Sequence, residues 1–235
     1  SDVADALEAA VKRGDHILVF GDFDLDGISA TTVLTRGLRA LGAQATPFIP
    51  LRFEEGYALS QAAITRACSF GPDFIVTVDC GIACKAEAAA VVEAGLGLAI
   101  TDHHEPVDLV PEGVPVADPK CDANCPSSIL AGVGVAFFLM AALNGKLEAM
   151  SGKRMDMRQV LDLVALGTLA DMVSLTGQNR ILVKNGLLKI AEAKRPGLAE
   201  LKGASGFSPV AALGAGQVVF NLAPRINAAG RLGSP

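Results

Sequence analysis

The sequence is poor in the aromatic residues on which nucleobases stack. Its 235 residues include no tryptophan and a single tyrosine, Tyr57, so an extended aromatic platform for single nucleic-acid strands is not encoded. Long apolar runs are missing too. Although 51% of the residues are hydrophobic, no run approaches the roughly 18 residues that a membrane span requires. We expect no membrane contact, and the amphipathic pattern of residues 1–14 argues against a signal peptide.

Cysteines are few and odd in number. The chain has five, at positions 68, 80, 84, 121 and 125, without a small secreted scaffold around them. We therefore expect reduced thiols in a cytoplasmic protein. Cys121 and Cys125 could form half of a zinc site, but no second Cys/His pair with suitable spacing follows.

Charge is divided unevenly along the chain. The net charge of −5 by itself argues against a nucleic-acid partner. However, residues 1–119 carry 7 basic and 18 acidic groups, whereas residues 120–235 carry 13 basic and 7 acidic groups. An acidic half beside a basic half fits a metal site that faces a polyanion, and it fits two solvated surfaces equally well.

Short apolar runs alternate with helical patterns in the first half of the chain. Strands are predicted at 16–20, 45–49, 74–78, 97–101 and 114–117, and helices at 29–41, 60–70 and 84–94. This alternation predicts an α/β fold, a parallel sheet flanked by helices. Further helices at 130–143, 156–169, 179–193 and 197–203, with a polar connection at 145–154, predict a mostly helical C-terminal half. We thus expect residues 1–125 to form the sheet part and 126–235 the helical part of one domain.

Three of the predicted strands end in acidic or histidine clusters. The strand at 16–20 is followed by Asp22, Asp24 and Asp26, the strand at 74–78 by Asp79, and the strand at 97–101 by Asp102, His103 and His104. Ligands bind at the carboxyl ends of the strands of open parallel sheets, so these side chains should meet. Such a cluster is repulsive unless divalent cations neutralise it.

The ligand types favour Mn²⁺ or Mg²⁺, because carboxylates and imidazoles are present without thiolate. Two such ions could share a carboxylate, activate a water and stabilise a departing oxygen, which is the chemistry of phosphoester hydrolysis. Each of these segments also has an ordinary interpretation that involves no phosphoesterase site. The Asp-x-Asp-x-Asp-Gly segment also begins calcium loops, although Val33 stands where the bidentate Glu would be, and Asp79 alone could be a turn residue.

Two segments of the second half carry candidate residues that spacing alone does not establish. Asp171 ends a long apolar run, where a turn residue is the ordinary interpretation. Arg225, Asn227 and Arg231 lie close together near the C-terminus. Their guanidinium groups could grip phosphate oxygens, or the segment could be a surface turn.

Together these segments resemble the DHH phosphoesterase family, and within it the RecJ-type single-strand-specific exonucleases. The resemblance covers essentially the whole chain. The Asp-His-His signature at 102–104 identifies only the wider family, which also contains pyrophosphatases and phosphodiesterases. The segments EGYALS (55–60), GTLADMVSL (167–175) and PRINAAGR (224–231) are similar to the RecJ type.

The resemblance implies a role for each candidate residue. Asp24 and Asp26 correspond to paired ligands, one for each of two metals, and Asp79 corresponds to the carboxylate that bridges them. Asp22 is an extra acid near the first metal, and Phe20 replaces a histidine that several relatives have. The other site residues implied are Asp102 among the catalytic acids, His103 and Asp171 as ligands, His104 as a ligand or phosphate contact, and Arg52, Arg225, Asn227 and Arg231 as phosphate contacts.

The resemblance also implies an activity. We expect a hydrolase with two divalent cations, Mn²⁺ in preference to Mg²⁺, that digests single-stranded DNA from 5′ to 3′ into mononucleotides during DNA repair and recombination. A helicase and a single-strand-binding protein are the implied partners of a monomeric chain. The family's second DHH-associated domain and oligonucleotide-binding domain are absent from this sequence, so we expect an isolated catalytic domain with weak or no activity.

Two other functions compete with this expectation. One is a DHH-family phosphodiesterase for short oligonucleotides or cyclic dinucleotides, which would fail to degrade long single-stranded DNA. The other is a binding scaffold that keeps the fold without catalysis. The intact set of acids and histidines argues against the scaffold.

Overall fold

The computed structural model describes the backbone of residues 2–230, and their side chains except those of residues 149 and 150. Its centre is a five-stranded sheet in the order β2-β1-β3-β4-β5, in which every neighbouring pair is parallel. The strands are β1 (His16–Phe20), β2 (Gln44–Phe48), β3 (Phe74–Val78), β4 (Gly97–Thr101) and β5 (Val116–Ala117). The predicted α/β class and parallel sheet are confirmed.

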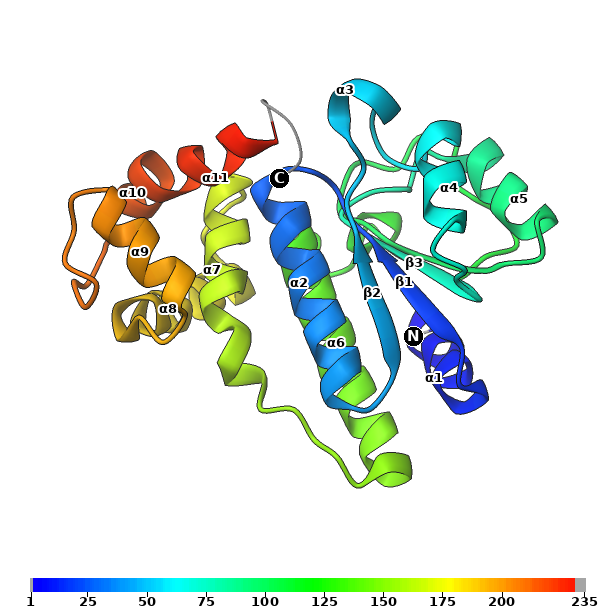
Figure 1. Cartoon of the computed structure of the whole chain (residues 1–235), viewed down its shortest axis with the longest axis horizontal. Coiled ribbons are helices and arrows are strands. Elements are labelled where there is room, and N and C mark those ends of the chain that lie inside the picture. Colours follow the sequence, from blue (N-terminus) through cyan, green and yellow to red (C-terminus); the bar gives the residue numbers. More distant parts are fainter. Residues whose placement is uncertain (1, 231–235) are drawn as a thin grey trace.

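Helices cover both faces of the sheet because its strands are apolar on both sides. In β1, Ile17 and Val19 belong to one core cluster and Leu18 and Phe20 to the other. The first face is covered by α1 (Asp2–Arg13), α2 (Leu25–Ala40) and α6 (Gly132–Ser151). The second face is covered by α4 (Gln61–Cys68) and α5 (Lys85–Glu93), and the short α3 (Arg52–Glu55) precedes α4 (Figure 1).

A helical layer packs on the far side of α2, as Figure 1 shows. Helix α7 (Leu161–Ala170) lies between α2 and α8 (Gly177–Glu192), and a third apolar core joins them to the remaining elements. These are α9 (Pro196–Ala204), α10 (Ala215–Gln217), a π-helical turn (Val218–Leu222) and α11 (Ala223–Ala229). The mostly helical second half is therefore confirmed.

Several predicted boundaries were wrong. Helix α2 begins at Leu25 instead of residue 29, because the Asp24 side chain caps it. Helix α6 runs through the predicted polar connection to Ser151, because Leu143 and Leu147 continue its buried face. The short helices α3, α10 and α11 were not predicted. Within the described residues, no helix has the length and hydropathy that crossing a membrane requires.

The contact between α7 and α8 depends on a glycine. A Cβ atom at Gly186 would lie 2.2 Å from the backbone oxygen of Leu161 and 2.4 Å from the Ala165 Cβ, so Gly186→Ala must push the two helices apart. We expect it to lower the free energy of unfolding by about 1–3 kcal/mol in urea denaturation. Gly145→Ala is the matched control, because Gly145 is exposed in α6 with nothing within 4 Å of its added Cβ. It should raise stability by about 0.5–1 kcal/mol, and equal effects of the two substitutions would contradict the packing argument.

Candidate metal centre

The acids that follow β1 are held in place by the start of α2. Asp24 is the N-cap of this helix, and its Oδ1 accepts hydrogen bonds from the backbone N–H groups of Asp26 (2.9 Å) and Gly27 (3.0 Å). Because Asp24 ends extended backbone and Asp26 lies in the first helical turn, the two carboxylates belong to one short turn at the edge of the sheet.

Asp26 is almost completely buried, with 1% of its surface exposed. Its two carboxylate oxygens accept hydrogen bonds from the N–H groups of Gly132 (2.7 Å) and Val133 (3.0 Å), which open helix α6. The positive end of the α6 dipole thus faces this carboxylate. Asp26 therefore joins α2 to α6, and lone pairs on its oxygens remain for a further ligand.

Asp79 follows β3 in a left-handed backbone conformation, with φ of 63°. Asp and Asn tolerate this region better than other non-glycine residues, and such outliers gather at functional sites. The side chain is buried, and its Oδ1 lies 3.0 Å from the Nε2 of His103. A Cβ at Gly132 would lie 2.3 Å from the same oxygen, so the start of α6 and this carboxylate are in close contact.

His103 stands between the acids from β1, β3 and α7. Its Nε2 is 3.9 Å from the Oδ2 of Asp26, and its Nδ1 is 3.7 Å from the Oδ2 of Asp171, the C-cap of α7. Both ring nitrogens are buried without a hydrogen bond of acceptable geometry, as are the Oδ2 of Asp171 and, despite its 3.0 Å distance to Nε2, the Oδ1 of Asp79. Buried polar atoms are normally satisfied, so four such atoms in one place form a set of ligands that a cation would satisfy.

Asp102 has a different environment from its neighbours. Its oxygens accept hydrogen bonds from the N–H groups of Ile82 (2.9 Å) and His103 (2.7 Å), and its Oδ1 lies 2.7 Å from the Nδ1 of His104. Burial opposes ionisation of this carboxyl, but the hydrogen bonds from His104 and Ile82 lower its pKa. Asp102 in turn raises the pKa of the half-exposed His104.

The predicted ligands form three overlapping groups. Within each, one ligand atom per residue lies within 4.8 Å of the others. The groups are Asp22 with Asp24 and Asp79, Asp79 with His103 and His104, and Asp26 with His103 and Asp171. Asp79 and His103 each belong to two groups. This donor set of carboxylates and imidazoles suits Mn²⁺ or Mg²⁺.

Four carboxyls of the cluster have raised pKa values in the absence of a cation. Burial raises the pKa of Asp22 to about 6. Burial and the neighbouring carboxylates raise the pKa values of Asp26 and Asp79 well above the ordinary range, and burial raises that of Asp171. A divalent cation would reverse this effect, because it favours the ionised form of each ligand.

The predicted phosphate contacts are dispersed. Arg52 lies over the Phe23 ring at 4.8 Å and donates a hydrogen bond to the Tyr57 hydroxyl, and Tyr57 and the acids Asp22 and Asp79 line one cleft. Asn227 accepts a hydrogen bond from the Leu25 N–H at 2.8 Å, which fastens α11 to the start of α2. Arg225 donates to the hydroxyl of Ser205 instead of extending to the acids, and Arg231 lies outside the described residues.

Sequence reasoning missed two residues beside the cluster. Asp118 directly follows β5 and is buried; its Oδ2 has no hydrogen-bond partner, and burial raises its pKa. Lys120 lines a cleft of about 310 Å³ together with His103 and Asp171. The signal for Asp118 was present, because an acid follows the fifth predicted strand just as acids follow the first, third and fourth.

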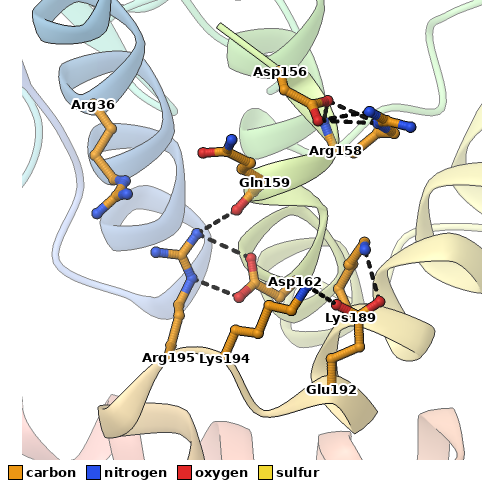
Figure 2. Close-up of a pocket in the computed structure, with 9 residues that line it drawn as sticks. All are labelled: Arg36, Asp156, Arg158, Gln159, Asp162, Lys189, Glu192, Lys194 and Arg195. Atoms are coloured by element: carbon orange, nitrogen blue, oxygen red, sulfur yellow. Dashed lines mark hydrogen bonds and ion pairs between the residues drawn. The ribbon is translucent and has the colours of Figure 1, made fainter.

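A larger cleft of about 560 Å³ lies toward the opposite ends of α2 and α7 (Figure 2). Its acids are occupied by their own basic partners. Asp162 accepts hydrogen bonds from Arg195 at 2.5 and 3.1 Å, and Glu192 pairs with Lys189 and Lys194. The Asp162–Arg195 pair ties the start of α7 to the segment between α8 and α9, so we interpret this cleft as structural.

Comparisons with known proteins agree with the geometry of the acid cluster. The family model described as the DHH family, N-terminal domain, matches residues 16–168. A protein named single-stranded-DNA-specific exonuclease RecJ from Salmonella typhimurium is 41% identical over 98% of this chain and 41% of its own length. The protein of that name from Thermus thermophilus is also 41% identical, over 99% of this chain and 33% of its own length. The chain therefore spans about a third to two-fifths of these relatives.

Solved structures agree in fold. A structure described as exonuclease RecJ bound to manganese superimposes with a TM-score of 0.86 at 40% identity, over all of this chain and 58% of the other. RecJ from Thermus thermophilus in complex with Mn²⁺ gives a TM-score of 0.81 at 38% identity, over 98% of this chain and 32% of the other.

The raised pKa of Asp22 predicts how metal-free stability depends on pH. Its folded pKa of about 6 exceeds its unfolded value of 3.8, so its contribution to stability is greatest below pH 3.8 and is lost as pH rises through 6. Asp22→Asn should therefore stabilise the chain in EDTA by about 2 kcal/mol at pH 7.5, and the difference should vanish toward pH 4. Urea denaturation at both pH values measures this. Asp108→Asn, at an exposed position, is the control, and a pH-independent effect at Asp22 would refute the prediction.

Proposed function

Since the chain belongs to the DHH family, we propose that it is the catalytic domain of a metal-dependent exonuclease that hydrolyses the phosphodiester bonds of single-stranded DNA. The observation that carries the proposal is the set of three overlapping ligand groups, whose buried atoms lack partners. The relatives named as RecJ exonucleases support the substrate class.

Two divalent cations, Mn²⁺ in preference to Mg²⁺, would fit these groups. Asp22 and Asp24 would bind one metal ion, and Asp26 and Asp171 would bind the other. Asp79 and His103 each belong to two ligand groups, so they could contact both metal positions. Bound cations supply two effects, a lowered pKa of water and neutralisation of charge on the phosphate. The RecJ structures that contain manganese support this choice of metal.

The chain's own groups orient the reactants. Asp102 holds the His104 ring through its Nδ1, which leaves Nε2 for the substrate, and the exposed half of this ring is accessible. A phosphate contact is therefore the role we propose for His104. Arg52 contacts the rings of Phe23 and Tyr57, and Tyr57 lines the cleft that contains Asp22, so the guanidinium of Arg52 could bind a terminal phosphate there.

The proposal treats residues 1–235 as one catalytic unit made of the sheet part and the helical part. A DNA substrate would place it in the cytoplasm, and a helicase and a single-strand-binding protein are the partners we propose for a monomeric chain. The length of the relatives beyond the matched region supports further domains in proteins of this kind.

The bridging role of Asp79 can be tested by metal titration. Asp79→Asn keeps a side chain that tolerates the left-handed backbone, so the fold should be retained. Calorimetry with Mn²⁺ should show two bound ions in the wild type and at most one in the variant. Cleavage should fall about 10³-fold, because several kcal/mol of charge stabilisation are lost. The exposed Asp108→Asn is the control, and two ions still bound to the Asp79 variant would disprove the bridge.

The exonuclease proposal can be tested with end-labelled single-stranded DNA and Mn²⁺. We expect a 5′ label to appear in mononucleotides at once, and a 3′ label to remain on strands that shorten progressively. Internal fragments from both substrates would exclude an exonuclease. Cleavage restricted to oligonucleotides of a few residues or to cyclic dinucleotides would favour the phosphodiesterase alternative.

A further inference from the structure

We infer that the cleft beside His103 and Asp171 binds a second phosphate of the strand, next to the one that is hydrolysed, and that Lys120 is the residue that contacts it. The inference rests on the proposed function of the acid cluster. It provides a binding position for a part of the DNA strand that neither the metal-ligand groups nor the predicted phosphate contacts cover.

The cleft is continuous with the acid cluster. It measures about 310 Å³, and its lining includes His103 and Asp171, which also belong to one ligand group. A molecule in this cleft therefore lies directly beside the metal position. On the other side of the cluster, a cleft of about 180 Å³ is lined by Tyr57, Ile82 and the acids Asp22, Asp79 and Asp102, and its described lining includes no lysine or arginine. The two clefts differ in chemistry, since the Lys120 side offers a cation and hydroxyl groups.

Lys120 is held on rigid backbone. Its N–H donates to the Oδ1 of Asp118 at 2.8 Å, and Pro119 fixes the first residue of the 3-10 turn that carries it. About a quarter of the side chain is exposed (27%). The lysine therefore starts from a fixed point, which lowers the entropy lost when its ammonium group binds a ligand.

The ammonium group of Lys120 has only a weak acidic partner. The Glu105 carboxylate lies 3.1 Å away, but this side chain is 80% exposed, and exposed ion pairs contribute little because water screens them. The cation is therefore available to an anion that enters the cleft. Within the described lining, Ser128 and Ser174 add hydroxyl groups that can donate to phosphate oxygens.

Electrostatics favour such a group at this place. A strand that approaches the acid cluster brings one negative charge per nucleotide, and the carboxylates repel every phosphate that no cation contacts. A lysine next to the metal position compensates the neighbouring phosphate. A contact to a phosphate does not depend on the identity of the base, which suits a nuclease that accepts any sequence.

The test combines a change in the protein with a change in the DNA. Lys120→Gln should raise KM about tenfold, with kcat within twofold of wild type, since one charge-assisted contact is lost. The slope of log affinity against log salt should fall by about 0.7, the value for one contact to single-stranded nucleic acid. Lys120→Arg should restore the KM and the salt slope of the wild type. Glu105→Gln, which leaves the lysine in place, should not raise KM.

The DNA change is a neutral methylphosphonate linkage placed next to the scissile phosphodiester. In the wild type it should raise KM about tenfold, and in Lys120→Gln it should have no further effect, because the contact is already missing. Equal losses in both proteins would show that Lys120 does not contact this phosphate. A loss of Mn²⁺ affinity in Lys120→Gln, measured by calorimetry, would assign the lysine to the metal centre and overturn the inference.

Failure of the proposed function gives a distinguishable result. If the full-length protein does not cleave single-stranded DNA with Mn²⁺, the exonuclease proposal is wrong, and fluorescence anisotropy of the unmodified and the methylphosphonate oligonucleotide still decides the inference. Weaker binding of Lys120→Gln with a reduced salt slope would support it. Wild-type binding and an unchanged slope would overturn it.

Discussion

Repulsion between buried carboxylates at one edge of the sheet is the constraint that shapes this protein. Asp22, Asp24, Asp26, Asp79 and Asp171 converge because parallel strands end together and because α7 ends at the same place. Each shifted pKa in the group is raised, and burial is the first cause in every case. The fold therefore holds its acids at a cost in free energy, which bound cations would offset.

The surrounding backbone supplies part of the compensation. The first amides of α6 donate to Asp26, the amide of Ile82 donates to Asp102, and the first amides of α2 donate to Asp24. Asp24 and Asp26 are structural caps as well as candidate ligands, so their removal affects two properties together. Asp79 differs, because its Oδ1 has no hydrogen-bond partner. Its replacement therefore reports more directly on metal binding.

Whether a site residue could be predicted from the sequence depends on the element that precedes it. The acids after β1, β3 and β4 were predictable because a strand end is visible in the sequence as an apolar run. Asp171 ends a helix, where an acid is ordinary, so only the family resemblance indicated it. Whether each of these residues binds a metal remains a prediction, because the structure shows proximity alone.

The errors have physical causes as well. Gly27 was left outside the helix predicted at 29–41 and Gly145 was placed in a polar connection, but both lie within helices whose capping and buried faces outweigh glycine's low propensity. The segment at 223–231 contains Pro224 and was interpreted as a possible turn. In the structure Pro224 occupies the first turn of α11, where its missing N–H is not needed, directly after the π-helical turn.

Helix α6 connects the acid cluster to helix α1. Its 20 residues extend about 30 Å, and one end donates its amides to Asp26. Toward the other end, Lys146 forms ion pairs with Asp5 and Glu8 of α1. Between them, Met140 packs against Gly37 so closely that a Cβ there would lie 2.5 Å from its Cε, which prevents α2 and α6 from sliding past each other. One helix thereby contacts both the Asp26 carboxylate at the sheet edge and the first helix of the chain, α1.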